Sequence, residues 1–327
     1  MKEKNITLSI IRVIATIMII FCHILQGLGS SWAYWANLGV TIFFFLSGYL
    51  YGNKKIEDIK SFYQSRFFKI LLPNIIVIFL AVLIEYLCFR TRPSIMVFIA
   101  SILGFGGFYQ LPPIVTHTWF VSYIALCYLL LPFFQYYFRE DKFKKNLKKL
   151  FILIIVLQLF QEFHVLWIES AWIVNFLLGY FFVHCCKREE DKKTCVLLLI
   201  VGTCFFTPFT IIYQEHIQTS LPRILNDHSM LWIQYGHVML GCFLFMVLYY
   251  GLNHFKLKYN KILKFLDTNS YYIYLVHQIF ILYTFSLLEI TNHLWINIGL
   301  IIICILIGSI LLKWIHKKVM KLIEVII

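Results

Sequence analysis

Apolar residues occur along this chain in long runs that are separated by short polar segments. Ten of the runs are near the ~20 residues that an α-helix needs to cross the ~30 Å hydrocarbon layer of a membrane. No internal repeat or low-complexity tract interrupts the pattern. The pattern predicts an all-α membrane protein, a single domain over residues 1–327 formed by a bundle of about ten transmembrane helices, with spans at roughly 7–27, 33–52, 67–89, 118–138, 150–168, 170–186, 195–213, 230–250, 270–290 and 295–315.

The basic residues divide the polar segments into two classes. Segments after the even-numbered spans and both chain ends are rich in Lys and Arg, whereas only Arg90, Arg92 and Arg223 of the 29 Lys and Arg lie elsewhere. Cytoplasmic loops carry this excess in membrane proteins, so we predict that both termini are cytoplasmic. The first apolar run is long and has no small-residue cleavage site, which favours a span over a removed signal peptide.

The composition agrees with a membrane protein and excludes a soluble one. Apolar residues make up 61 %, charged residues 14 %, and the mean hydropathy is +0.79, whereas a soluble globule is about half apolar and one quarter charged. The net charge of +13 follows from the basic cytoplasmic segments, so we predict no nucleic-acid partner. The nine Cys include no C-x-x-C pair, which favours reduced, buried thiols and predicts no metal site. Any chemistry must therefore use the helices or the outer segments 90–117 and 214–229.

The first span carries two ionisable residues, Arg12 and His23, and such residues are functional candidates because they are costly in hydrocarbon. Eleven residues turn a helix about three times, so both lie on one face, ~16 Å apart along the axis. Arg12 near the cytoplasmic end suits a phosphate, and His23 suits a base that takes a proton from a hydroxyl. The alternative is that each side chain snorkels to its nearer interface. The helix alone does not decide between them.

The third span begins with a second basic pair, Arg66 and Lys69, whose spacing of three predicts one face at the cytoplasmic mouth. Together with Arg12 they would form a cation cluster for a phosphate-rich ligand. Ordinary anchoring at the membrane surface is the alternative, and it is favoured for Lys69 taken alone. Pro73 predicts a kink in this helix.

Two further segments carry polar candidates. His117 and Trp119 stand at the start of the fourth span, where an indole stacks on a sugar ring or simply anchors at the interface, and the residues alone favour anchoring. His277 lies inside the ninth span and either lines the same cavity or bonds a nearby carbonyl.

Other positions have structural interpretations. Ser47 and Gly48 permit close helix packing, and Asp267 and Asn269 are typical of a helix N-cap before Ser270. One of four carboxylates near outer helix ends is a candidate to orient His23, and the sequence does not choose among Glu85, Glu162, Glu169 and Glu215.

The chain resembles the acyltransferase-3 family of integral membrane acyltransferases, typically bacterial O-acetyltransferases of surface polysaccharides. The resemblance covers residues from about 5 to 315 and rests on five segments in the family's order: LSIIRVIATIMIIFCH, FFFLSGYL, FYQSRFFKILLP, HTWFVSYIALCYLLLP and SYYIYLVHQ. It implies that His23 is the catalytic base, that Arg12 is needed for donor binding, and that Arg66 and Lys69 help receive an acyl-CoA co-substrate. It also implies that His117 and Trp119 belong to the acceptor passage, and we add His277 as a substrate-binding candidate.

Two positions depart from the family pattern. The usual Asp-Gly before the first-span Arg is Ser9-Ile10, so we expect no carboxylate partner for Arg12 there. The usual Arg-x-x-Arg pair ends in Lys69, which keeps the charge but loses the bidentate fork for phosphate. An extracellular esterase-like domain that some members carry is not expected in this chain.

These observations predict an O-acyltransferase that moves an acetyl group, or another short acyl group such as succinyl, from cytoplasmic acetyl-CoA. The expected acceptor is a hydroxyl of a cell-surface or lipid-linked glycan, and the expected location is the plasma membrane of a bacterium, with membrane lipid around the chain. Direct transfer and a transient acyl-His both fit. A transporter or flippase of a glycan intermediate is the alternative, but such a protein predicts repeats in matched halves. A scaffold without activity would leave the intramembrane Arg12 and His23 without a function.

Overall fold

The computed structural model describes residues 5–140, 142–163, 168–214 and 228–326, and within these ranges the chain is helical, without a β-strand. An apolar segment in hydrocarbon must satisfy its own backbone hydrogen bonds, which a helix does. Seven helices of the described part are long and apolar enough to cross a membrane, and they confirm the first four, the seventh, the eighth and the tenth predicted spans: Ile6–Gly27, Trp32–Tyr51, Ile59–Phe89, Pro113–Tyr137, Glu189–Gln214, Ser229–Asn253 and Leu294–Val325.

The other three predicted spans fall on helices of a different kind. Helix α9 (Ser170–His184) is apolar but has only 15 residues. Helix α8 (Phe143–Glu162) begins inside the basic segment, and α13 (Lys261–Ile281) carries many polar residues. The count of ten spans and the cytoplasmic location of the termini stay predictions.

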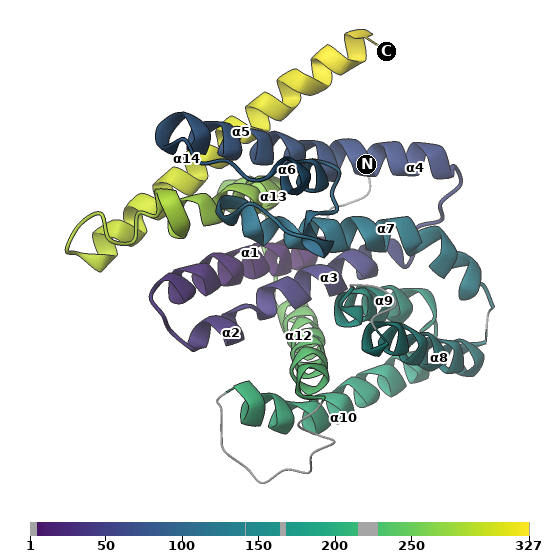
Figure 1. Ribbon diagram of the computed structural model, residues 1–327. Helices are drawn as coiled ribbons and strands as arrows, with labels where there is room; N and C mark the ends of the chain where they lie inside the picture. The colour runs from purple at the N-terminus through teal and green to yellow at the C-terminus, as the bar shows by residue number, and fades with distance from the viewer. Residues whose placement is uncertain (1–4, 141, 164–167, 215–227, 327) are drawn as a thin grey trace. The chain divides into compact units, whose positions relative to one another are not determined.

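The chain divides into two compact units. The first comprises residues 1–15, 37–55 and 131–259. It contains α3 (Leu38–Tyr51), α8, α9, α10 (Glu189–Gln214) and α12 (Ser229–Asn253), with the first part of α1 (Ile6–Gly27). Within it α3 packs against α9 and α12, and α10 packs against α12 (Figure 1).

The second unit comprises residues 16–36, 56–130 and 260–327, and it contains the rest of α1. Its helices α5, α13 and α14 pack against one another, and the short η3 packs against α13 and α5. The elements of this unit are α2 (Trp32–Ala36), α4 (Ile59–Arg66), η1 (Phe67–Leu71), α5 (Leu72–Phe89), α6 (Ile95–Ile102), η2 (Gly106–Phe108), η3 (Pro113–Thr118), most of α7 (Trp119–Tyr137), α13, η4 (Tyr283–Phe285) and α14 (Leu294–Ile326).

Two glycines allow α3 and α9 to approach closely in the first unit. A Cβ atom at Gly48 would overlap the carbonyl oxygen of Phe176, and one at Gly179 would overlap that of Phe45. The two contacts are reciprocal, since each glycine faces the backbone of the other helix. The role predicted for Gly48 as a small packing residue is confirmed.

The irregularity expected near Pro73 takes the form of a π-helical turn. The turn is η1, which ends at Leu71, two residues before Pro73 in the first turn of α5. Proline cannot donate a backbone hydrogen bond, and a π-turn is one of the usual ways in which a helix accommodates an interruption.

The structure corrects the predicted ninth span at both ends. Helix α13 begins at Lys261 with Asn260 as its cap, whose side chain accepts from the backbone N–H of Leu263 at 2.8 Å. Asp267 and Asn269 are therefore not an N-cap but buried residues inside the helix. The amide of Asn269 donates to the carbonyl of Phe265 at 2.7 Å. This bond to the preceding turn makes a polar side chain compatible with a helix interior.

The helix ends at Ile281, nine residues before the predicted boundary. Leu282 is extended, and Tyr283 has a φ of 64°, a left-handed backbone that no α-helix contains. The chain then turns back, and the backbone N–H of Leu287 donates to the carbonyl of Phe280 at 3.0 Å.

The two outer segments differ in how much of them is described. Residues 90–117 contain α6, which has eight residues and is too short to span, as predicted. Most of the segment 214–229, with Glu215 and Arg223, lies outside the described residues.

Candidate active site

Three histidines of the second unit meet in one place, and we call them the histidine cluster. His23 comes from α1, His117 from η3 and His277 from α13. The ring centroids of His23 and His277 are 4.9 Å apart, and those of His117 and His277 are also 4.9 Å apart. The structure therefore brings together three of the predicted site residues that are far apart in the sequence.

His277, the middle member, is fully buried. Its Nδ1 donates to the carbonyl oxygen of Tyr274, one turn earlier in α13. A neutral imidazole with hydrogen on Nδ1 carries a lone pair on Nε2. This Nε2 is buried and has no hydrogen-bond partner among the described residues. Buried polar atoms are almost always paired, so an unpaired acceptor marks a place where a donor from a ligand fits.

His117 is held by a set of bonds between η3 and α13. Its Nε2 donates to the carbonyl of Leu275 at 3.0 Å, and its backbone N–H donates to Oε1 of Gln278 at 2.7 Å. The amide of Gln278 donates in turn to Thr116 Oγ1 at 2.6 Å, and the hydroxyl of Tyr274 donates to the carbonyl of His117. Nδ1 of His117 is the second buried nitrogen of the cluster that no described group contacts by a hydrogen bond.

His23 is the partly exposed member of the cluster. Its Nδ1 donates to Oε1 of Gln26 at 3.0 Å, one turn later on α1. This bond fixes the tautomer and leaves the lone pair on Nε2. Among the described residues the polar partner of His23 is thus an amide, whereas Glu215, one of the four candidate carboxylates, lies outside them. Glu85, the candidate in this unit, accepts from Thr284 at 2.9 Å.

The arrangement suits proton transfer better than metal binding. Each ring uses one N–H toward the protein and keeps one lone pair, which is the state of a general base or a hydrogen-bond acceptor. The described residues contain no group of three His, Cys, Asp or Glu placed to hold a metal ion. The contact between the rings of His23 and His277 also shows that His23 faces buried protein, which argues against simple snorkelling.

Arg12 lies eleven residues before His23 on the same uninterrupted helix, α1. The rise of 1.5 Å per residue separates their Cα atoms by ~16 Å, and the near-integral number of turns places both on one face. Arg12 is partly buried.

The structure gives Arg66 and Lys69 different surroundings. The guanidinium of Arg66 lies over the rings of Phe62 and Tyr128, at 5.7 and 5.6 Å from their centroids, and donates to Ser65 Oγ at 3.1 Å. Lys69 is exposed within the π-turn. A π-turn uses i→i+5 bonds and is wider than an α-turn. Residues three apart, such as Arg66 and Lys69, are therefore farther from sharing one face here than they would be on a regular α-helix. The cluster of both residues with Arg12 stays a prediction.

Trp119 is the first residue of α7, two residues after His117. Its ring meets Tyr123 edge to face at 5.8 Å and is partly exposed. The indole therefore stands beside the histidine cluster in the chain and has surface left for a ligand.

Three residues that build the site were not singled out from the sequence. Gln26 carries a weak signal, because a spacing of three from His23 places it on the same face. Tyr274 and Gln278 stand inside SYYIYLVHQ, the segment that contains His277. Their bonds to His117 depend on η3 lying against α13, which no sequence pattern of this chain predicts.

Comparison with known proteins identifies the family of the chain. The family model described as an acyltransferase domain matches residues 5–314, which is nearly the whole chain. Comparisons with curated proteins and with solved structures give no match. Together with the apolar helices, the match shows a multi-pass membrane acyltransferase, and the chain belongs to the acyltransferase-3 family.

Proposed function

We propose that this protein is an O-acyltransferase that moves an acetyl group from cytoplasmic acetyl-CoA to a hydroxyl of a cell-surface or lipid-linked glycan. The observation that carries the proposal is His23, whose Nδ1 is tied to Gln26 and whose Nε2 is left as an acceptor, with its ring in contact with buried His277, which in turn contacts His117. The family match supports acyl transfer in general. The resemblance of the motifs to bacterial enzymes supports a bacterial plasma membrane.

The chemistry follows from the lone pair on His23. Nε2 takes the proton of the acceptor hydroxyl, while the hydroxyl oxygen bonds to the thioester carbonyl carbon. The carbon–sulfur bond then breaks, and the CoA sulfur leaves with the proton that His23 returns to it. In the alternative two-step route, Nε2 attacks the thioester carbon, the carbon–sulfur bond breaks and CoA leaves as a thiolate. The acceptor hydroxyl then attacks the acyl group on His23, the acyl–nitrogen bond breaks, and the hydroxyl proton passes to the CoA sulfur.

The basic residues supply the donor side of the proposal. Arg12 is placed on the helix of His23 at a distance that suits a long donor arm, and its guanidinium binds phosphate oxygens well. Arg66 and Lys69 add positive charge at the start of the third span. The positive-inside distribution supports a cytoplasmic location for this end, where acetyl-CoA is available.

The acceptor side uses the remaining predicted residues. Nδ1 of His117 and Nε2 of His277, which have no hydrogen-bond partner among the described residues, accept hydrogen bonds from sugar hydroxyls. The exposed part of Trp119 offers a face for a sugar ring. These three residues are therefore proposed to bind the acceptor, with His23 as the base.

The test is transfer of radiolabelled acetyl from acetyl-CoA in membranes that contain wild type or His23→Ala at matched abundance. We expect the variant to lose label by about 10²-fold or more, the usual share of a general base. His254→Ala is the matched control, because His254 is exposed at the end of α12, and it should label like wild type. Equal labelling by His23→Ala would contradict the base, and no label with any protein would contradict the donor and favour glycan transport.

A further inference from the structure

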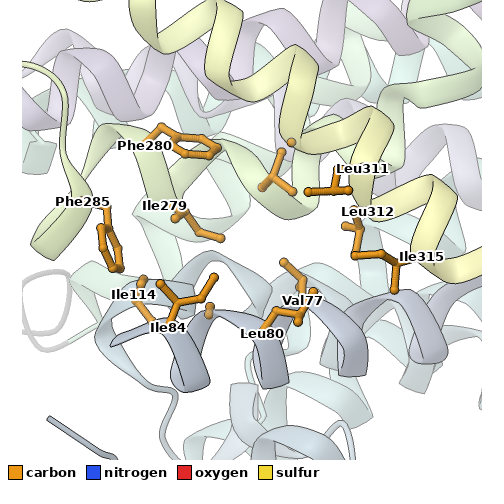
Figure 2. A pocket seen from close by; sticks show the side chains of 13 residues that line it. Val77, Leu80, Ile84, Ile114, Ile279, Phe280, Phe285, Leu311, Leu312 and Ile315 are labelled. Carbon is orange, nitrogen blue, oxygen red and sulfur yellow. The ribbon is translucent and has the colours of Figure 1, made fainter. Parts of the chain in front are cut away.

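An apolar groove lies in the second unit between α5, α13 and α14. Figure 2 shows side chains of the three helices pointing into one space, with Val77 and Ile84 from α5, Phe280 from α13, and Leu312 from α14 among the 13 residues that line it. The groove has a volume of about 210 Å³. None of the lining residues is charged or carries a polar side chain.

Gly308 keeps the groove open on the α14 side. A Cβ atom at this position would lie 3.2 Å from Phe280 Cε2 and 3.6 Å from Val276 Cγ2. A larger side chain would therefore fill the space that the other residues leave. The same helix offers a comparison at Gly299, where a Cβ would meet nothing within 4 Å.

The groove shares its walls with the histidine cluster. Val276, Ile279 and Phe280 line it from α13, and their spacing of three and four places them on one face of the helix. His277 follows Val276 and so stands on the adjoining face. The second shared wall is Ile114 of η3, three residues before His117. A molecule seated in the groove is thus next to the site.

The chemistry of the lining limits the occupant to a hydrocarbon chain. A sugar or a phosphate in the groove would leave its polar atoms without partners, which is costly in an apolar site. The walls α5 and α14 belong to helices that are long and apolar enough to cross a membrane, where hydrocarbon chains surround a protein. An acetyl group has too few carbons to use such a space, and this argues for the acceptor rather than the donor.

We propose that this groove binds the hydrocarbon chain of the acceptor, so that the substrate is a lipid-linked saccharide whose polar head meets the histidine cluster. The assignment rests on the proposed function and deepens it. A second apolar cavity, of about 300 Å³ in the first unit, does not include a residue of the histidine cluster or its neighbours, and no acceptor is assigned to it.

The test follows radiolabelled acetyl from acetyl-CoA into native membranes and separates the product by extraction with organic solvent. Wild type should place label in the lipid extract. Gly308→Leu should lower this label by about tenfold at limiting acceptor, which corresponds to a loss of about 1.4 kcal/mol in binding. Leu80→Trp fills the same groove from α5 and should act in the same direction, so the result does not depend on one variant folding.

Two leucine variants serve as controls. Gly299→Leu adds the same side chain to α14 in open space, and Gly202→Leu adds it at the second cavity, where a Cβ lies 3.1 Å from Met239 Sδ. Both should label like wild type at equal abundance. Label in the lipid extract that Gly308→Leu and Leu80→Trp leave unchanged would overturn the groove assignment. Label found only in material that the solvent does not extract would overturn the lipid-linked acceptor but keep acyl transfer, whereas no label at all would overturn both.

Discussion

At the scale of single residues, the site depends on which nitrogen of each histidine is free. The tautomer of His23 is set by Gln26, and that of His277 by a backbone carbonyl. The sequence identifies His23 and His277 because an ionisable residue inside an apolar run is conspicuous. It does not identify their partners, since an amide one turn away and a main-chain oxygen leave no distinctive pattern.

Gln26 should act as a positioning residue. Gln26→Leu removes the acceptor of the Nδ1–H, so the ring loses its fixed tautomer and we expect kcat to fall by at least about tenfold. Gln26→Glu keeps an oxygen at this place and should retain most of the rate. The measurement is kcat at saturating acetyl-CoA. An equal loss in both variants would indicate a packing role, and an unchanged rate in Gln26→Leu would remove Gln26 from the mechanism.

His277 should matter through its nitrogens and not through its volume. His277→Phe keeps a ring of similar size but removes the buried Nε2 acceptor, and we expect acetyl transfer to fall by about tenfold or more, with the larger effect on KM for the acceptor. His316→Phe is the comparison, because both nitrogens of His316 are already bonded, to Tyr272 and to the carbonyl of Phe68. A loss of transfer in His316→Phe alone would contradict the role of His277.

At the scale of elements, apolar runs predict where helices lie better than where they begin and end. The runs locate the seven membrane-length helices because length and hydropathy are local properties. They misplace α13, since its first turns carry lysines and its polar residues are bonded inside the helix. The π-turn before Pro73 is likewise a local solution that the proline suggests but does not specify.

The contact between α3 and α9 should be sensitive to a single methyl group. Gly48→Ala places a Cβ on the backbone of Phe176, and the resulting overpacking should cost about 1–3 kcal/mol. Thermal unfolding in detergent should show a Tm several degrees lower than that of wild type. Gly251→Ala is the control, because a Cβ there meets nothing within 4 Å. Equal Tm values for the two variants would contradict a close glycine contact.

An ion-pair group joins Glu140, just before α8, to two lysines of that helix and makes stability depend on pH. Hydrogen bonds from Lys145 and Lys149, at 2.7 and 2.8 Å, lower the pKa of Glu140 from 4.5 to about 2. A lowered pKa means that this contribution is present above pH 4.5 and is lost as the pH falls toward 2. The Tm difference between wild type and Glu140→Gln should therefore be constant near neutral pH and shrink below pH 4.5. A difference that grows on acidification would contradict this pairing.

At the scale of the whole molecule, the distribution of basic residues predicts the orientation in the membrane. A fluorescent protein fused after Lys55 should fluoresce in the cytoplasm, and alkaline phosphatase fused after Arg92 should be active outside it. The reverse pattern would contradict cytoplasmic termini, and with them the route proposed for acetyl-CoA.

Side chains of α13 complete the hydrogen bonds of backbone groups in other elements, and this affects how readily hydropathy identifies the helix. The hydroxyl of Tyr271 donates to the carbonyl of Ile70 within the π-turn, and Tyr274 and Gln278 form hydrogen bonds with the main chain of His117. Irregular backbone is tolerated at membrane depth only where protein groups complete its hydrogen bonds. The helix that does this must carry polar side chains, and it is not among the seven helices that hydropathy selects. Length and hydropathy therefore select seven other helices and pass over α13, although its side chains complete backbone hydrogen bonds in two neighbouring elements.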